Sequence, residues 1–253
     1  MKALITGASS GIGRDMARVL SQMGYSLILV ARRRERLEEL QSELRTEVQI
    51  ICADLSKEQA CFDLYDQVKA DKIDILVNNA GFGMFGAFHE TDMKRELNMI
   101  RVNITAVHIL TKLFLRDFKK RNSGMILNVA SSAAFLPGPL LGAYYATKSY
   151  VLRLTEAVYE ELRRENSMVS VSVLCPGPVR TEFDKTADVT FSVKGLESRK
   201  VAEYAIKMLF RKKLIIVPGI MMKCARFVER LLPEKVLLKA AYHMQKRKQG
   251  KGI

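Results

Sequence analysis

Short, continuously apolar runs alternate with longer amphipathic stretches along most of this chain. A strand buried on both faces is apolar throughout, so each short run is expected to be a strand of a parallel sheet. An amphipathic stretch between two such strands is expected to be a helix covering one face of that sheet. The predicted strands are Lys2–Thr6, Ser26–Ala31, Glu47–Cys52, Ile73–Asn78, Gly124–Ala130, Val169–Cys175 and Leu214–Val217. The predicted helices are Gly11–Met23, Arg33–Leu44, Lys57–Lys69, Lys94–Lys120, Ala143–Glu165 and Ser198–Phe210.

This order predicts an α/β fold: a doubly wound, seven-stranded parallel sheet with a C-terminal helical extension. The 253 residues contain no Pro-, Gly- or Ser-rich linker, no internal repeat and no low-complexity segment. Because α/β folds of about 250 residues often form one unit, we expect residues 1–253 to be a single domain. Residues 219–253 form its basic amphipathic extension.

A glycine-rich turn follows the first predicted strand and leads into the first predicted helix. It reads Thr6-Gly7-Ala8-Ser9-Ser10-Gly11-Ile12-Gly13, with the spacing G-x-x-x-G-x-G. Glycines permit close approach to the backbone, and a helix N-terminus attracts a pyrophosphate. A tight strand-to-helix connection is the alternative explanation. However, doubly wound folds bind dinucleotides at this first turn.

Further motifs follow the turn at 6–13 in a fixed order: Asn78-Asn79-Ala80-Gly81, Asn103, Ser131 with the Tyr144-x-x-x-Lys148 pattern, and Pro176-Gly177. Together with the turn they resemble the motifs of the short-chain dehydrogenase/reductase family. The resemblance extends through Thr181 and is nearest to NADP-dependent carbonyl and 3-oxoacyl reductases. It implies a Rossmann-type, dinucleotide-binding oxidoreductase with Ser131, Tyr144, Lys148 and Asn103 as catalytic residues. In that family the Asn holds a water that links the Lys to solvent. The resemblance also implies a homodimer or homotetramer that meets through helices 94–120 and 143–165.

The spacing of Tyr144 and Lys148 has its own chemical meaning. Residues four apart share one face of a helix. A nearby ammonium lowers the pKa of a phenol from about 10, so Tyr144 is expected to act as an acid or base near neutral pH. Tyr145 is the competitor, but uncharged Ser149 stands four residues after it. The spacing therefore selects Tyr144.

A serine hydroxyl is expected to bind the substrate carbonyl and stabilise the charge that develops on its oxygen. Ser131 ends the fifth predicted strand, thirteen residues before Tyr144. Spacing alone does not exclude the adjacent Ser132. We choose Ser131 because its separation from Tyr144 matches the family.

The end of the second predicted strand indicates the cofactor. An enzyme that uses NAD places a carboxylate there, whereas NADP requires its absence and is favoured by Arg. Ala31 is followed by Arg32-Arg33-Arg34, with no acidic residue before Glu35. Arg32 and Arg33 can therefore form charge-assisted hydrogen bonds with a 2′-phosphate, which predicts NADP(H).

Asp54 resembles the family residue that contacts adenine, and a helix N-cap is an equally consistent role. The motifs and the resemblance together imply cofactor contacts from Gly7, Ser9, Ser10, Gly11, Ile12, Gly13, Arg32, Arg33, Asp54, Leu55, Asn79, Ala80, Gly81, Tyr144, Lys148, Pro176, Gly177, Val179 and Thr181.

The positive charge of the chain is concentrated near its C-terminus. The net charge is +14, and residues 211–253 hold twelve Lys and Arg against two Glu. Two basic amphipathic helices are predicted, Ile220–Leu232 and Glu234–Lys248, with a frayed end over 245–252. We favour a lid over the substrate cleft or a subunit contact. Peripheral contact with a membrane surface is the alternative, and we predict no nucleic-acid partner.

Apolar residues near the motifs predict a largely apolar substrate pocket. They are Phe82, Met84, Phe85, Phe135, Leu136, Phe183, Val189, Phe191 and Val193, although core packing explains many of them equally well. The sequence thus predicts hydride transfer between NADP(H) and a ketone or secondary alcohol, with a hydrophobic 3-oxoacyl, steroid-like or other ketone as substrate. A catalytically silent NADP-binding regulator or membrane-docked scaffold is the alternative. The absence of a signal-peptide pattern and of an apolar run of about 20 residues predicts a cytoplasmic protein, and no metal site is expected from the Cys and His spacing.

Overall fold

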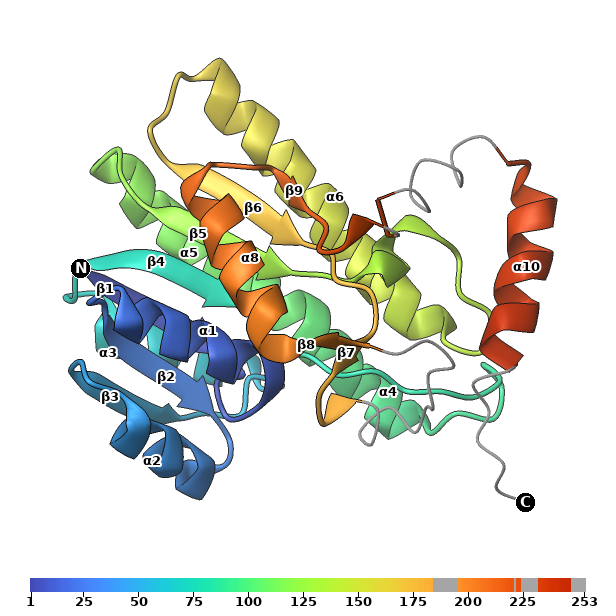
Figure 1. The fold of residues 1–253 in the computed structure, drawn as a ribbon, viewed down its shortest axis with the longest axis horizontal. Coiled ribbons are helices and arrows are strands. Elements are labelled where there is room, and N and C mark those ends of the chain that lie inside the picture. The colour runs from blue at the N-terminus through green and yellow to red at the C-terminus, as the bar shows by residue number, and fades with distance from the viewer. Residues whose placement is uncertain (184–194, 221, 224–231, 247–253) are drawn as a thin grey trace.

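The computed structural model describes residues 1–183, 195–220, 222–223 and 232–246. Its main sheet has seven strands, all parallel, in the order β3-β2-β1-β4-β5-β6-β9 (Figure 1). The predicted doubly wound α/β fold is therefore confirmed. The strands are β1 (Lys2–Thr6), β2 (Ser26–Ala31), β3 (Val48–Cys52), β4 (Ile73–Asn78), β5 (Met125–Val129), β6 (Ser170–Leu174) and β9 (Ile215–Ile216).

Helices cover both faces of this sheet (Figure 1). α1, α2 and α8 pack on one face, and α3, α5 and α6 pack on the other. Successive residues of β1 point to opposite faces of the sheet. Ala3 and Ile5 pack with the core on the side of α1, α2 and α8, while Leu4 packs with the core on the side of α3, α5 and α6. This alternation is why the strands are apolar throughout. The helices are α1 (Gly11–Gln22), α2 (Arg34–Glu43), α3 (Glu58–Val68), α4 (Met93–Ile100), α5 (Val107–Lys120), α6 (Gly142–Arg164), α8 (Ser198–Phe210) and α10 (Glu234–Lys246).

The order of the strands reverses between β1 and β4. The strands on either side of this point wind in opposite directions, so their connecting loops diverge and leave a crevice at the carboxyl ends. The loops after β1, β4, β5 and β6 carry the sequence motifs, and the topology brings all four loops to that edge.

Two local features differ from the prediction. The expected helix Lys94–Lys120 is divided into α4 and α5 by a π-helical turn, Arg101–Ala106. Such turns often occur at functional sites, and this one contains Asn103. A second, two-stranded sheet pairs β7 (Val179–Arg180) with β8 (Leu196–Glu197). Two-residue strands are too short to show a periodic pattern.

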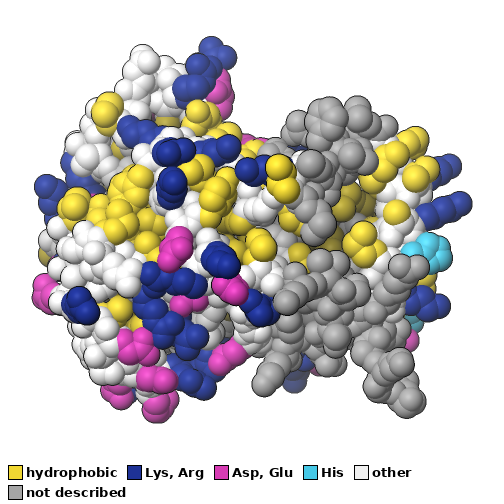
Figure 2. Space-filling model, viewed as in Figure 1, with side chains coloured by type: hydrophobic (Ala, Val, Ile, Leu, Met, Phe, Trp, Pro, Cys, Tyr) yellow, Lys and Arg dark blue, Asp and Glu magenta, His cyan; other side chains and the backbone are white. Residues whose placement is uncertain are grey.

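α10 lies beyond the carboxyl ends of the strands, at the edge of the molecule (Figure 1). Basic side chains project from its outer edge (Figure 2). The helix predicted over 220–232 falls largely outside the described residues. Gln245 is only 1% exposed, so the frayed end predicted to begin there is wrong at this position. None of the described helices has both the length and the apolarity needed to span a membrane.

Candidate functional site

The glycine-rich turn and the loop after β4 are held together by two side chains, those of Asn79 and Thr6. Asn79 donates from Nδ2 to the carbonyl oxygens of Thr6 and Gly7, at 3.0 and 3.1 Å. The Thr6 hydroxyl accepts from the backbone N–H groups of Asn79 and Ala80, at 3.0 and 3.1 Å. These four hydrogen bonds fix the two motifs relative to each other.

Two glycines of the turn adopt a backbone conformation that side chains disfavour. Gly7 and Gly11 have φ values of 65° and 54°. A Cβ on Gly7 would lie 2.8 Å from the Cα of Ala80. Gly13 is needed for a different reason, because a Cβ there would collide with the Asn79 side chain and the Gly7 carbonyl. It therefore permits close packing of α1.

A cavity of about 970 Å³ opens above this turn, at the carboxyl ends of the strands. All of the predicted site residues line it except Gly13 and Asn103, which lie behind its wall. Ser10, the N-cap of α1, makes no capping hydrogen bond with its side chain, and the N-terminus of a helix favours an anion. The turn and the cavity therefore fit a dinucleotide with its pyrophosphate at α1.

Ser131, Tyr144 and Lys148 converge on one wall of the cavity. Tyr144 is 8% exposed. Burial raises the pKa of its phenol well above the usual range, and a hydrogen bond with Ser131 only partly offsets this rise in pKa. Lys148 Nζ donates to the Val129 carbonyl at 3.0 Å and lies 5.8 Å from the centre of the Tyr144 ring.

The raised pKa of Tyr144 differs from the lowered phenol pKa expected from the sequence. Spacing showed that a cation lies near Tyr144, but it did not show how completely both groups are buried. Burial also lowers the pKa of Lys148 to about 8, so the ammonium is itself less favoured. The structure therefore holds Tyr144 as a neutral phenol, the form that can donate a proton.

The neighbours of these residues have other partners. The Tyr145 phenol receives a hydrogen bond from Gln245 Nε2 rather than facing Ser131. Ser132 uses its backbone N–H to bind the Pro176 carbonyl, at 2.8 Å. The Ser131 side chain forms a hydrogen bond with Tyr144.

Asn103 is fully buried and acts between two elements. Its Oδ1 accepts from the Phe82 N–H at 3.1 Å, while Nδ2 donates to the Phe82 carbonyl at 2.9 Å and to Thr147 Oγ1 at 3.0 Å. A Cβ on Gly81 would lie 2.9 Å from Asn103 Oδ1 and 3.2 Å from Lys148 Nζ. Asn103 therefore joins the loop after β4 to the helix that carries Tyr144 and Lys148.

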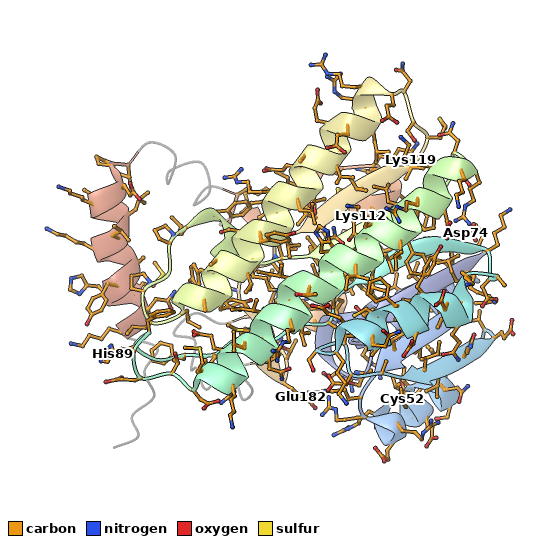
Figure 3. The ribbon with its side chains drawn as sticks, turned by 180° about the vertical axis from the view of Figure 1, so that it is seen from behind. Cys52, Asp74, His89, Lys112, Lys119 and Glu182 are labelled. Carbon is orange, nitrogen blue, oxygen red and sulfur yellow. The ribbon has the colours of Figure 1, made fainter. Side chains whose placement is uncertain are left out.

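The other end of the cavity is basic. Arg33 Nη2 donates to Glu182 Oε2 at 2.8 Å and to Ser9 Oγ at 3.3 Å. Arg36 lies 4.0 Å from the same carboxylate, which is labelled in Figure 3. The hydrogen bond from Arg33 holds the pKa of Glu182 below its usual range. Arg32 lines the cavity, and none of the described carboxylates pairs with it.

Asp54 also lines the cavity, but it does not cap α3. Its Oδ1 accepts from the backbone N–H and the hydroxyl of Ser56, at 3.2 and 2.9 Å. The N-cap of α3 is Lys57. The N-cap alternative is therefore wrong, and Asp54 shapes the loop after β3 at the edge of the cavity.

The remaining wall is largely apolar. Phe82, Phe135, Leu136 and Phe183 line the cavity as predicted. Met84 and Phe85 do not, because they pack beneath it with Met99 and Leu141 in a small core. The predicted lining residues Val189, Phe191 and Val193 lie outside the described residues. The sequence did not identify Leu141, Arg95 or Asn98 as lining residues. It favoured the segment of α10 as a lid over the cleft or a subunit contact, but it did not name the residues that this helix contributes to the cavity: Leu237, Ala240, Ala241, Met244 and Gln245.

Comparison with known proteins now identifies the family. A family model described as short chain dehydrogenase matches residues 1–190. The chain belongs to the short-chain dehydrogenase family. It is therefore an oxidoreductase, in a family that binds a nicotinamide cofactor.

This short-chain dehydrogenase is similar in sequence to several known proteins. An uncharacterized oxidoreductase of Staphylococcus epidermidis is 33% identical over 209 residues, 82% of this chain and 90% of the relative. The very-long-chain 3-oxoacyl-CoA reductase of Homo sapiens is 32% identical, covering 72% of this chain and 61% of that protein. The human 17-beta-hydroxysteroid dehydrogenase type 3 is 35% identical, covering 72% and 60%.

Solved structures of the family include complexes with both nicotinamide cofactors. A short-chain dehydrogenase from Sphingobium yanoikuyae in complex with NADPH is 28% identical, covers 100% of this chain and 98% of its own, and has a TM-score of 0.82. A short-chain dehydrogenase/reductase from Burkholderia phymatum in complex with NAD is 26% identical, covers 94% of each chain, and has a TM-score of 0.83.

Proposed function

We propose that this short-chain dehydrogenase reduces a hydrophobic ketone with NADPH. The observation that carries the proposal is one continuous cavity with three chemically different regions. Arg32 and Arg33 form its basic end, Ser131 and Tyr144 stand on its wall, and apolar side chains, many of them from α10, form the rest. A cofactor that spans the first two regions leaves the apolar region for the substrate.

The protein side chains have separable roles in this reaction. NADPH, when bound, supplies the hydride. The Ser131 hydroxyl orients the carbonyl oxygen, and Tyr144 donates a proton to that oxygen as negative charge develops. Because Tyr144 rests as a neutral phenol, it is already in the form that reduction needs. Lys148 grips the ribose of the cofactor and, when charged, favours the phenolate that proton donation leaves.

The choice of NADP(H) rests on the chemistry at the end of β2. Ala31 is followed by two arginines that line the cavity, where an enzyme that uses NAD would place an acid. Arg33 already binds a carboxylate there, that of Glu182, so the position is suited to an anion. The Sphingobium relative bound to NADPH supports this choice, whereas the Burkholderia relative bound to NAD shows that the fold alone does not decide it.

The substrate class is supported by the apolar wall and by the relatives. The names of the two human relatives refer to a very-long-chain 3-oxoacyl-CoA and to a hydroxysteroid. A long acyl chain and a steroid ring system are both bulky and apolar, and both suit the apolar wall of the cavity. A hydrophobic 3-oxoacyl, steroid-like or other bulky ketone is therefore the proposed substrate.

We also propose that residues 1–253 fold as one cytoplasmic domain that forms a homodimer or homotetramer. The free thiols of Cys52 and Cys61 are consistent with a reducing compartment. Leu97 and Tyr150, on the helices through which the family is expected to associate, are 42% and 37% exposed. Sedimentation equilibrium tests the assembly, and a monomer at micromolar concentration would contradict it.

Substitution of Tyr144 by Phe tests the proposed reaction. A panel of ketones and 3-oxoacyl thioesters is assayed by the loss of NADPH absorbance. Tyr144→Phe should lower kcat by about 10²- to 10⁴-fold, because the general acid is lost, and should leave the Kd for NADPH within about twofold because the phenyl ring remains. Tyr159→Phe, farther along α6, is the matched control. A Tyr144→Phe enzyme with unchanged turnover would contradict the proposal.

A further inference from the structure

One polar side chain stands in the apolar roof of the cavity. Gln245 is 1% exposed, although glutamine is mostly a surface residue. It is the polar member of the α10 residues that line the cavity. The other four, Leu237, Ala240, Ala241 and Met244, are apolar. Its position therefore needs a chemical explanation other than simple packing.

The two ends of the Gln245 amide have different environments. Nε2 donates to the phenol oxygen of Tyr145. Oε1 is buried and accepts no hydrogen bond from any described residue. A buried amide oxygen without a donor costs free energy, so native structures generally pair it. Gln245 also lines the cavity, so a ligand that packs against α10 is a candidate for the missing donor.

Contacts on both sides of Tyr145 fix the position of this amide. The Tyr145 ring occupies the space beside Gly138, where even a Cβ would overlap the ring. On its other side the ring packs edge-to-face against Tyr144, with centroids 6.1 Å apart and an interplanar angle of 76°. Gln245 is thereby held one side chain away from the proton donor.

We propose that Gln245 determines substrate specificity by accepting a hydrogen bond from the substrate. The inference rests on the proposed function, because it concerns the same cavity. The preferred ketone is mainly apolar but carries one hydrogen-bond donor, a hydroxyl or amide N–H, on the part that lies beneath α10. A ketone without that donor leaves Oε1 unpaired, and a site built to accept a hydrogen bond discriminates against such an analogue.

The test uses linear ω-hydroxy ketones and their O-methyl ethers, with one to eight methylene groups between the carbonyl and the oxygen. At one chain length the wild type should prefer the hydroxy ketone in kcat/KM by at least about tenfold. Gln245→Met, of similar length and without the amide, should reduce that preference to within twofold. Lys246→Met, at the adjacent exposed position, is the matched control and should keep the preference.

A second variant separates recognition from a purely structural role. Tyr145→Phe removes the partner of Nε2 but leaves Oε1 in place, so it should keep the preference for the hydroxy ketone. If Tyr145→Phe loses the preference as fully as Gln245→Met, Gln245 only holds α10 in place and the proposal fails. It also fails if the wild type shows no preference at any chain length.

Binding measurements distinguish this failure from failure of the proposed reaction. Calorimetric titration of the same pairs into the Tyr144→Phe protein with NADPH reports the hydroxy-to-ether affinity ratio without turnover. That ratio should be lost on adding Gln245→Met. Absence of ketone reduction by the wild type would contradict the proposed function, whereas an affinity ratio near one would contradict the role of Gln245.

Discussion

Glu182 places a carboxylate at the basic end of the cavity, against the arginine that we assign to the 2′-phosphate of NADPH. Arg33 cannot give its full fork of donors to both anions at once. Binding of NADPH must therefore weaken the Arg33–Glu182 contact, which is 2.8 Å long. Removing the charge with Glu182→Gln should strengthen the binding of NADPH more than the binding of NADH, because NADH has no 2′-phosphate.

The size of the effect follows from exposure and distance. Both side chains are 46% exposed, and a pair this exposed is worth about 0.2–1 kcal/mol. A carboxylate about 6 Å from a phosphate adds repulsion of about 0.7 kcal/mol per unit charge in water. The sum of about 0.9–1.7 kcal/mol corresponds to a decrease of about 5- to 20-fold in the Kd for NADPH.

Fluorescence titration of both cofactors gives the two dissociation constants for each protein. Glu39→Gln is the matched control, because Glu39 pairs with Arg36 on the surface and does not line the cavity. Low ionic strength should enlarge the difference. Weaker NADPH binding by Glu182→Gln, or an equal change for NADPH and NADH, would refute the competition between the carboxylate and the phosphate.

Three further outcomes are expected. Replacing Arg32 and Arg33 by Ala should reduce the affinity for NADPH at least about 100-fold more than the affinity for NADH, since each charge-assisted contact contributes about 1.5–3 kcal/mol. Equal losses of affinity for the two cofactors would disprove the assignment of these arginines to the 2′-phosphate. Burial lowers the pKa of Lys148 from 10.5 to about 8, so between these pH values Lys148 contributes a rise in stability with pH, because it binds more protons in the unfolded chain; urea unfolding of Lys148→Met should lose this contribution relative to the wild type, and parallel pH profiles of the two proteins would contradict the lowered pKa. Gly81→Ala places a Cβ 2.9 Å from Asn103 Oδ1 and 3.2 Å from Lys148 Nζ, and should cost about 1–3 kcal/mol of unfolding free energy, with wild-type stability in thermal unfolding as the contrary result.

The sequence predicted the parts of the structure that depend on local patterns. The apolar runs gave the strands, and the parallel topology then brought the motif loops to one edge, because their order along the chain determines which strand ends they follow. Tyr144 and Lys148 are four residues apart, so they share one face wherever the segment forms a helix. These inferences needed no knowledge of distant contacts.

What the sequence could not show depends on packing between distant segments. Met84 and Phe85 have the same character as Phe82, yet they lie beneath the cavity, where they pack with Met99 and Leu141. The raised pKa of Tyr144 reflects burial by several elements, which the spacing of two residues does not report. The position of α10 over the cavity depends on contacts such as that between Gln245 and Tyr145, exactly one hundred residues apart.

The hydrogen bonds of Asn79 have a consequence for how this protein can change. Thr6 and Asn79 are 73 positions apart, yet neither the turn nor the loop keeps its shape without the other. A side chain at Gly13 would collide with both the Asn79 side chain and the Gly7 carbonyl. A smaller residue at position 79 would relieve only the first of these contacts, and it would release the Thr6 and Gly7 carbonyls. The two segments should therefore be inherited, or transplanted into another scaffold, as a matched pair.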